Sequence, residues 1–237
     1  MKRLMPIFIV ILLSGCGILT AYAPNMLSMI VVAVMGVVVL LGIIYGLIPV
    51  LTFTQGLLTG QKSIQRASEA EEKSVWITAL QMDRFFRQKK MDQLFREYRD
   101  KVKQQRQNGQ IVSDLEDILN EDVLALYSWQ GVVAQIPGTL TGLGILGTFI
   151  GLLRGLRNIN FVTVEAALSS VQSILTGIDT AFYTSIAGVI LSILFNISNN
   201  ILRNTMDREM GIFLEVFHRV VLPTTQEQER YRSRRET

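Results

Sequence analysis

The chain has 237 residues, of which 49% are hydrophobic and 18% are charged, and its formal net charge is +3. The charges are unevenly distributed: after Lys2 and Arg3 none occurs before Lys62, and none occurs from Val123 through Leu153. A soluble domain of this size would not lack charge over such long stretches, so the pattern predicts an integral membrane protein. A single Cys and a single His exclude a disulfide framework and leave little room for a metal site.

The first apolar stretch, residues 4–58, is long enough for two membrane-spanning helices. A bilayer core about 30 Å thick needs about 20 predominantly apolar residues per helix. We place the two spans at residues 4–22 and 27–53, because the Pro24-Asn25 pair between them opposes continuation of a helix.

Two further apolar segments follow a charged region. The third span is predicted at residues 133–156 and the fourth at residues 170–201. The fourth is longer than a bilayer requires, so it must tilt or project from the membrane. The predicted fold class is an all-α integral membrane protein with four transmembrane helices and a helical cytoplasmic extension.

The basic residues predict the orientation of these spans, since Lys and Arg near span ends favour the cytoplasmic side. Residues 2 and 3 are both basic, twelve basic residues lie within 62–106, and seven lie within 203–235. We therefore expect both termini in the cytoplasm. Twelve acidic residues balance the basic residues of the large loop, so we do not expect nucleic-acid binding.

The first span has a second interpretation. Leu13-Ser14-Gly15-Cys16 also resembles a bacterial lipoprotein cleavage site that follows a short charged and apolar leader. Cleavage before Cys16 would leave a lipidated protein with three spans. Apolar residues continue to Ala23, however, and complete a full-length span, so we favour an unprocessed helix.

The segment 56–132 predicts a helical cytoplasmic region. An apolar stripe recurs at helical spacing on an otherwise charged helix, made by Met91, Leu94, Phe95, Tyr98 and Val102. Ser113-Asp114-Leu115-Glu116 has the form of a capping box that begins another helix. The region after residue 202 keeps a helical pattern through Val220 before a polar tail.

The third span carries glycines at four-residue spacing: Gly138 and Gly142, then Gly147, Gly151 and Gly155. Lipid provides no hydrophobic drive for helices to associate, so small residues that let backbones approach are a main source of packing contact. We predict that these glycines pack the third span against its neighbours. The same span carries three hydroxyl side chains, Thr139, Thr141 and Thr148.

The fourth span carries one small and polar stripe, in which Thr184, Gly188, Ser192 and Asn196 step by four residues. We predict that Gly188 contributes to helix packing and that Thr184 lines a polar face.

Asp179 is the only acidic residue inside a predicted span. A carboxylate at the centre of a bilayer costs about 2.5 to 3.5 kcal/mol on insertion scales, so it usually faces a cavity, a partner or an ion path. The alternative is that Asp179 lies at the outer interface and pairs with Arg154 or Arg157.

These residues resemble a known family. Leu146-Gly147-Thr148-Phe149-Ile150-Gly151 looks like the core of the third span in MotA/TolQ/ExbB proton-channel subunits. Asp179 followed by Thr184, with Gly188 and Asn196 beyond, is similar to the last span of that family. The segment 137–152 most resembles the ZorA subunits of Zorya anti-phage systems.

The resemblance implies a ring of five copies around a central pair of helices from a partner subunit. That partner would be a MotB-, ExbD-, TolR- or ZorB-like protein with one span and a membrane aspartate. Thr148, Thr184, Asp179 and Ser185 would then line the path of H+, or of Na+, in a motor of the bacterial inner membrane. The process driven would be anti-phage defence, flagellar-type motility or envelope transport.

The chain then divides into two peripheral spans at 1–55, a cytoplasmic helical region at 56–132, pore-forming spans with a short outer loop at 133–201, and a cytoplasmic helix and tail at 202–237. We expect no enzymatic activity and no cofactor, because the sequence offers no catalytic triad, phosphate loop or metal-ligand cluster. The alternative function is a non-conducting membrane scaffold whose glycines only promote oligomerisation.

Overall fold

A computed structural model describes residues 5–69, 82, 84–108, 110, 112–157, 159 and 162–222. The basic pair at residues 2 and 3 and the polar tail from Pro223 lie outside the described residues. The described part is helical, without β-strands. It forms two compact units, Met1–Ile48 with Trp129–Leu202 and Pro49–Ser128 with Arg203–Thr237, and each is considered by itself.

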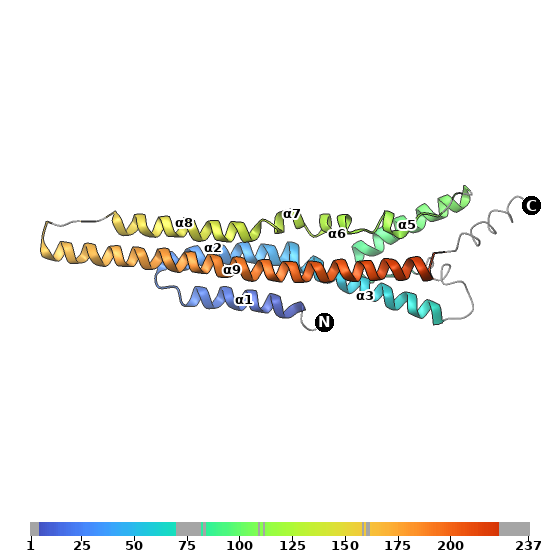
Figure 1. Cartoon of the computed structure of the whole chain (residues 1–237), viewed down its shortest axis with the longest axis horizontal. Helices are drawn as coiled ribbons and strands as arrows, with labels where there is room; N and C mark the ends of the chain where they lie inside the picture. The colour runs from blue at the N-terminus through green and yellow to red at the C-terminus, as the bar shows by residue number, and fades with distance from the viewer. Residues whose placement is uncertain are drawn as a thin grey trace, which may run out of the picture. The chain divides into compact units, whose positions relative to one another are not determined.

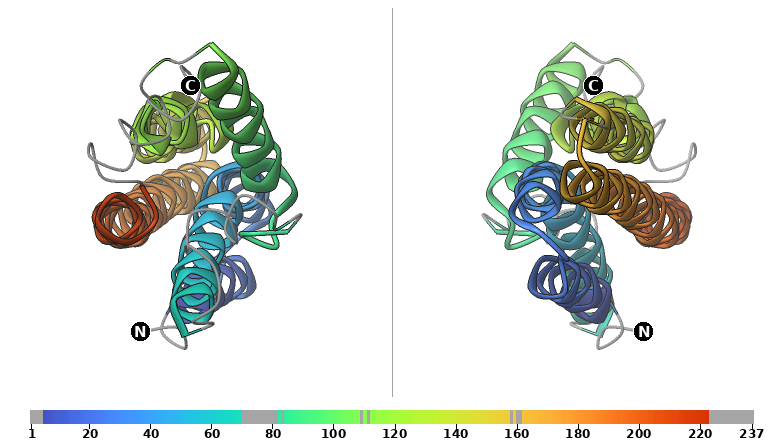
Figure 2. Two further views of the ribbon diagram at one scale, coloured as in Figure 1. Left: turned by 90° about the vertical axis from the view of Figure 1, so that its right-hand side faces the viewer. Right: turned by 90° about the vertical axis from the view of Figure 1, so that its left-hand side faces the viewer.

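The first unit contains the apolar helices (Figure 1). They are α1 (Met5–Ala21), α2 (Met26–Gly42), α7 (Gln130–Val133), α8 (Ile136–Leu156) and the first part of α9 (Val164–Val220). α2 contacts both α1 and α8. α8 runs beside the first part of α9 in both end-on views (Figure 2).

Three helical segments of the described chain are long and apolar enough to cross a membrane: Met26–Arg66, Gln130–Leu156 and Val164–Val220. They correspond to the second, third and fourth predicted spans. The first predicted span coincides with α1, whose 17 helical residues fall short of that length. The described residues therefore form a helical structure in which three helices have membrane-spanning length.

The turn predicted between the first two spans is capped by Asn25. Its side-chain oxygen accepts hydrogen bonds from the Ser28 backbone N–H at 2.9 Å and from the Ser28 hydroxyl at 3.1 Å. These bonds satisfy one of the backbone donors that every helix start leaves unpaired. The Pro24-Asn25 pair therefore ends one helix and begins the next, as the sequence predicts.

The second predicted span contains a proline that does not end the helix. α2 continues through a π-helical turn, Ile43–Leu47, directly into α3 (Ile48–Glu69), which contains Pro49. Proline has no backbone N–H and its ring clashes with the carbonyl four residues earlier, here that of Tyr45. The wider π-helical turn just before Pro49 lets the chain remain helical.

The second unit is built on an aromatic core. The predicted stripe of α5 (Lys89–Gln107) is confirmed, since Met91, Leu94, Phe95, Tyr98 and Val102 are all buried. Phe95 and Tyr98 belong to a ring cluster with four further buried aromatic residues, Phe85, Phe86, Phe213 and Phe217, the last two from α9.

Phe95 lies at the centre of this cluster. Its ring stacks on Phe85 with centroids 4.5 Å apart and meets Phe86 and Phe217 edge to face. Such pairs add about 0.5 to 1.5 kcal/mol each beyond the burial of their area.

Polar contacts join α5 to the segments beside it. Near its start Asp92 is buried, and its carboxylate accepts the Phe86 backbone N–H at 2.8 Å. In the middle of α5 the Tyr98 hydroxyl donates to the Ser113 carbonyl at 3.1 Å. Burial raises the pKa of Tyr98 above its ordinary value, and the neighbouring carboxylates of Asp114 and Asp117 raise it further.

The capping box predicted at residues 113–116 is wrong. Asp114, not Ser113, caps the short 3-10 helix Leu115–Asp117. Ser113 is instead bonded to Gln105, whose side chain accepts the Ser113 N–H at 2.9 Å and donates to its hydroxyl at 2.7 Å. A side chain from the previous helix thus replaces the partner that the local pattern predicted.

Asn120 caps the next helix, α6 (Glu121–Tyr127), by accepting the Val123 N–H at 3.0 Å. Asp114 also lies 2.6 Å from the Nδ1 atom of His218, the only histidine, which places that residue in a structural contact.

α9 is a single helix of 57 residues. At 1.5 Å per residue it is about 85 Å long, more than a bilayer thickness. Its buried residues lie on one side along most of this length. They are Gly177, Ala181, Thr184, Gly188, Leu191, Phe195, Ser198, Leu202, Met206, Met210, Phe213 and Phe217. The fourth predicted span is therefore part of a longer helix that also supplies the aromatic core of the second unit.

We predict that Phe95→Ala destabilises the protein by about 3 to 5 kcal/mol, because it leaves a cavity in the aromatic core. Thermal unfolding of the purified full-length chain in detergent measures the loss as a lower midpoint. The exposed neighbour Arg96→Ala provides the matched control and should leave the midpoint nearly unchanged. Equal midpoints for the two variants would contradict the assigned core.

Candidate functional site

The contact between α8 and α9 is made by backbone atoms, because glycines line both helices. A Cβ atom added at Gly151 would lie 2.9 Å from the Ala181 nitrogen and from the Gly177 carbonyl oxygen. A Cβ atom added at Gly177 would lie 2.7 Å from the Gly151 carbonyl oxygen, and one added at Gly188 would lie 2.7 Å from that of Leu140. No side chain larger than hydrogen fits at these positions without moving a backbone.

The predicted packing glycines take different positions. Gly147, Gly151 and Gly188 lie at this contact, whereas Gly138 and Gly142 have no other atom of the described chain within 4 Å of an added Cβ. The latter two face away from the rest of the chain. Gly155, which belongs to the predicted spacing, also lies at the contact, and so do Gly144 and Gly177, which the prediction did not include.

Thr148 and Thr184 come together at the glycine-lined contact. The Thr148 hydroxyl donates to the Gly144 carbonyl of its own helix at 3.1 Å and to the Ala181 carbonyl of α9 at 3.2 Å. Thr184 is fully buried, and its hydroxyl also lies 3.2 Å from the Ala181 carbonyl. One carbonyl oxygen is therefore shared by the two hydroxyls that the sequence assigned to an ion path.

Close packing holds Thr184 in place. A Cβ atom added at Gly147 would lie 2.5 Å from the Thr184 Oγ1 atom. Glycine at position 147 thus makes the room in which this hydroxyl sits. Thr148 is only half-buried.

Hydroxyl side chains continue along α9 from Thr184 toward its first turns. Thr176, Thr180 and Thr184 each donate to the carbonyl four residues earlier, at 2.9, 2.8 and 2.9 Å. The Asn25 side chain donates to the Thr180 hydroxyl at 2.6 Å. This line of hydroxyls was only partly recognised in the sequence. The predicted stripe began at Thr184, although Thr176 and Thr180 continue its four-residue steps toward the start of α9.

The other two residues predicted to line the ion path, Asp179 and Ser185, do not belong to the pair of hydroxyls that share the Ala181 carbonyl. Asp179 is exposed, and it forms no ion pair within the described part of the chain. The alternative pairing with Arg154 or Arg157 is therefore not found within one chain. Ser185 is half-buried, and its Cα lies 3.3 Å from where a Gly144 Cβ would be.

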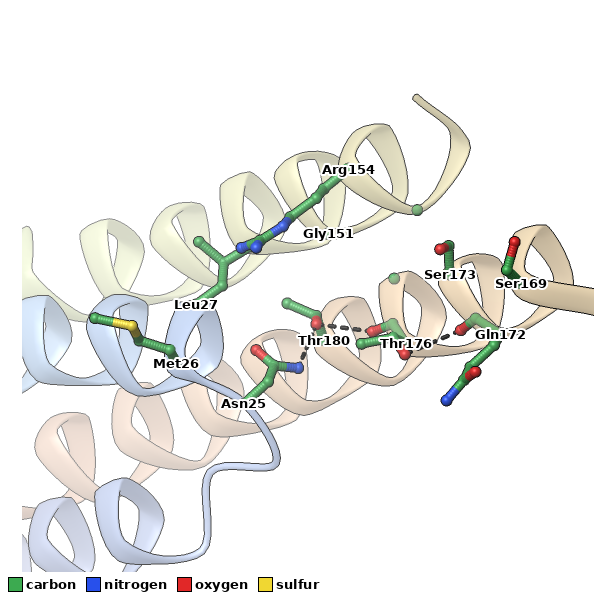
Figure 3. Close-up of a pocket in the computed structure, with 12 residues that line it drawn as sticks. Asn25, Met26, Leu27, Gly151, Arg154, Ser169, Gln172, Ser173, Thr176 and Thr180 are labelled. Atoms are coloured by element: carbon green, nitrogen blue, oxygen red, sulfur yellow. Dashed lines mark hydrogen bonds between the residues drawn. The ribbon is translucent and has the colours of Figure 1, made fainter. Parts of the chain in front are cut away.

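A polar pocket of about 490 Å³ lies at the end of the α8–α9 contact. It is lined by Asn25 from the turn before α2, by Arg154 at the end of α8, and by Ser173, Thr176 and Thr180 of α9, among others (Figure 3). Among the described residues no cluster of His, Cys, Asp and Glu side chains could hold a metal ion.

Comparison with known proteins identifies the family. Residues 12–205 match the sequence profile of the family described as anti-phage protein ZorA of the Zorya type I system. The chain belongs to the ZorA family. This membership confirms the resemblance seen in the third and fourth spans, and it favours anti-phage defence among the three processes that the sequence left open.

Two curated ZorA family members are similar over a shorter segment. A Zorya protein ZorA from Escherichia coli strain Crooks is 47% identical over 60 residues, and one from a second Escherichia coli strain is 43% identical over 60 residues. Each alignment covers 25% of this ZorA family chain but only 10% and 8% of the two relatives. The chain thus matches a small part of the length of these relatives.

We predict that Gly177→Ala destabilises the protein by about 1 to 3 kcal/mol, because its methyl group would press on the Gly151 carbonyl and separate the two helices. The matched control is Gly211→Ala on the same helix, where the methyl group meets open space. That change should be neutral or slightly stabilising, since alanine is a better helix former than glycine. Thermal midpoints of the purified variants in detergent provide the measurement, and a tolerated Gly177→Ala contradicts the backbone contact.

Proposed function

We propose that this chain is the ring-forming, ion-conducting subunit of a motor complex in the bacterial inner membrane that acts in anti-phage defence. The observation that carries the proposal is the pair Thr148 and Thr184, whose hydroxyls share the Ala181 carbonyl at the contact of two membrane-length helices. Membership of the ZorA family supports anti-phage defence as the process in which the chain acts.

The chemistry of this pair suits a proton or a small cation. A threonine hydroxyl both donates and accepts hydrogen bonds, and a carbonyl oxygen is a strong acceptor. Thr148 bonds to two carbonyls at 3.1 and 3.2 Å, so its proton can turn to either while an oxygen lone pair remains for a passing ion or water. The partner carboxylate, supplied by a second protein with one span, would complete the path on the half-buried side of Thr148.

The proposed arrangement is a ring of five copies with four spans each and both termini in the cytoplasm. α1 supplies the remaining span: its 17 residues form a helix about 25 Å long, close to the hydrocarbon thickness. The exposed glycines Gly138 and Gly142 support oligomerisation, since small residues without a partner in the chain favour close approach of a helix from elsewhere.

Asp179 also supports assembly beyond the single chain. Its carboxylate is exposed on a helix of membrane-spanning length, where contact with lipid would cost several kcal/mol. A neighbouring copy, the partner subunit or water in a central passage would remove that cost. In the proposed ring Asp179 and Ser185 border the ion path beside the threonine pair.

We predict that Thr184→Val lowers ion flux by about tenfold. Loss of one hydrogen bond to the ion or its water removes roughly 1.4 kcal/mol, which corresponds to about tenfold in rate. Flux is measured with a pH-sensitive dye in liposomes that contain the chain and its one-span partner, with sodium present or absent to identify the ion. Thr148→Val should act similarly, and Thr184→Ser should restore flux.

The control for this experiment is Thr139→Val, because that hydroxyl is exposed and bonds only to the Gln135 carbonyl of its own helix at 3.1 Å. Normal flux in both Thr148→Val and Thr184→Val would refute the ion path. Loss of phage protection by Gly177→Ala, with no measurable flux in any variant, would instead favour the non-conducting scaffold.

A further inference from the structure

The polar pocket at the end of the α8–α9 contact has no role in the path described above. Its volume is about 490 Å³, within the range of small-molecule sites and much larger than a phosphate ion requires. Three segments converge on it: the turn that begins α2, the end of α8 and the first turns of α9 (Figure 3).

The pocket carries one positive charge and no negative charge. Arg154 is the only ionisable side chain among its lining residues. Arg154 is exposed and forms no ion pair in the part of the chain that the structure describes. A guanidinium group without a carboxylate repels cations and attracts anions, so the pocket is unsuited to collecting H+ or Na+ for the ion path.

Neutral donors complete the lining. The hydroxyls of Ser169 and Thr176 are occupied by carbonyls of their own helix. Ser173 also lines the pocket, and its hydroxyl has no hydrogen-bond partner among the described residues. The Arg154 guanidinium extends toward Leu27, while Ser173 lies at the other side of the pocket (Figure 3). A guanidinium fork is especially suited to the oxygens of a phosphate group.

The surroundings of the pocket point to the boundary between lipid and water. Met26 lines it with 73% of its surface exposed, and Tyr22, on the same turn, is 78% exposed. Tyrosine is enriched where a bilayer meets water. Exposed apolar side chains beside a cationic polar pocket resemble the two halves of a phospholipid, its acyl chains and its headgroup.

We propose that this pocket binds a phosphate group at the outer end of the helices, in the form of a phospholipid headgroup or of free phosphate. The proposal rests on the proposed membrane orientation but not on ion conduction, so it can fail while the ion path stands. Arg154 holds the phosphate oxygens with its guanidinium fork.

The test uses the purified full-length chain in detergent after lipid removal. Phosphatidylglycerol is added in one arm, diacylglycerol with the same acyl chains in a second, and inorganic phosphate in a third. Native mass spectrometry counts retained lipid, and the thermal midpoint reports binding in all arms. We expect retention of phosphatidylglycerol about tenfold above that of diacylglycerol, since only the former presents the charge-assisted acceptor.

The variants separate the pocket from general surface charge. Arg154→Gln should lower phosphatidylglycerol retention by about tenfold and Arg154→Lys by less, because lysine keeps the charge but loses the fork. Arg157→Gln is the matched control, as Arg157 is exposed one turn further along but does not line the pocket. Midpoints measured without lipid show whether any variant is simply misfolded.

A midpoint that rises with inorganic phosphate alone, and only when Arg154 is present, would support the site and identify free phosphate as the source. Equal retention of diacylglycerol and phosphatidylglycerol would overturn the proposal. Equal effects of Arg154→Gln and Arg157→Gln would overturn it as well, since attraction would then be a property of the whole basic end of the helices.

Discussion

The close approach of two backbones between α8 and α9 is the constraint on which the candidate site depends. Gly151 and Gly177 bring the helices so near that carbonyl oxygens and Cα atoms make the contact. Only at this separation can the Thr148 hydroxyl reach a carbonyl of the other helix, at 3.2 Å. In lipid, where apolar surface gives no driving force for association, such packing and interhelical hydrogen bonding are what hold helices together.

The same contact explains why the polar groups here are tolerated within apolar helices. Each hydroxyl of the line from Thr176 to Thr184 is satisfied by a carbonyl of its own helix. An unsatisfied hydroxyl in hydrocarbon would cost several kcal/mol. The chain therefore carries a line of hydroxyls whose hydrogen bonds are satisfied within a single helix.

Local chemistry made much of the fold predictable from the sequence. Long stretches without charge indicated the membrane helices, and the Pro24-Asn25 pair indicated the turn that Asn25 caps. Spacing also predicted the buried stripe of α5 around Phe95. What the sequence could not give depended on distant partners. The Gln105 side chain accepts the Ser113 N–H, so the predicted capping box at Ser113 does not form. The π-helical turn before Pro49 keeps a helix continuous where proline usually ends one.

The candidate site shows the same division. The sequence identified Thr148 and Thr184 by their resemblance to a family motif, but not their shared acceptor, since a backbone carbonyl carries no sequence signal. Glycine spacing alone did not separate Gly151, which faces α9, from Gly142, which faces open space. That distinction needs the rotation of the helix about its axis, which the neighbouring helices set.

The spacing of buried residues along α9 has a geometric consequence. Gly177, Thr184, Leu191 and Ser198 recur every seven residues. A seven-residue repeat drifts by about 20° per repeat on a straight α-helix, or about 60° over these three repeats. The buried residues Leu202, Met206 and Met210 then follow Ser198 at three successive intervals of four, each advancing the stripe by about 40° in the opposite sense, and the three-residue step to Phe213 takes back about 60°. Phe213 therefore lies 36 residues, or about ten helical turns, beyond Gly177 and on the same side of the helix axis. The mixed spacing thus keeps the buried stripe on one flank of α9, whereas an unbroken seven-residue repeat would require a supercoil.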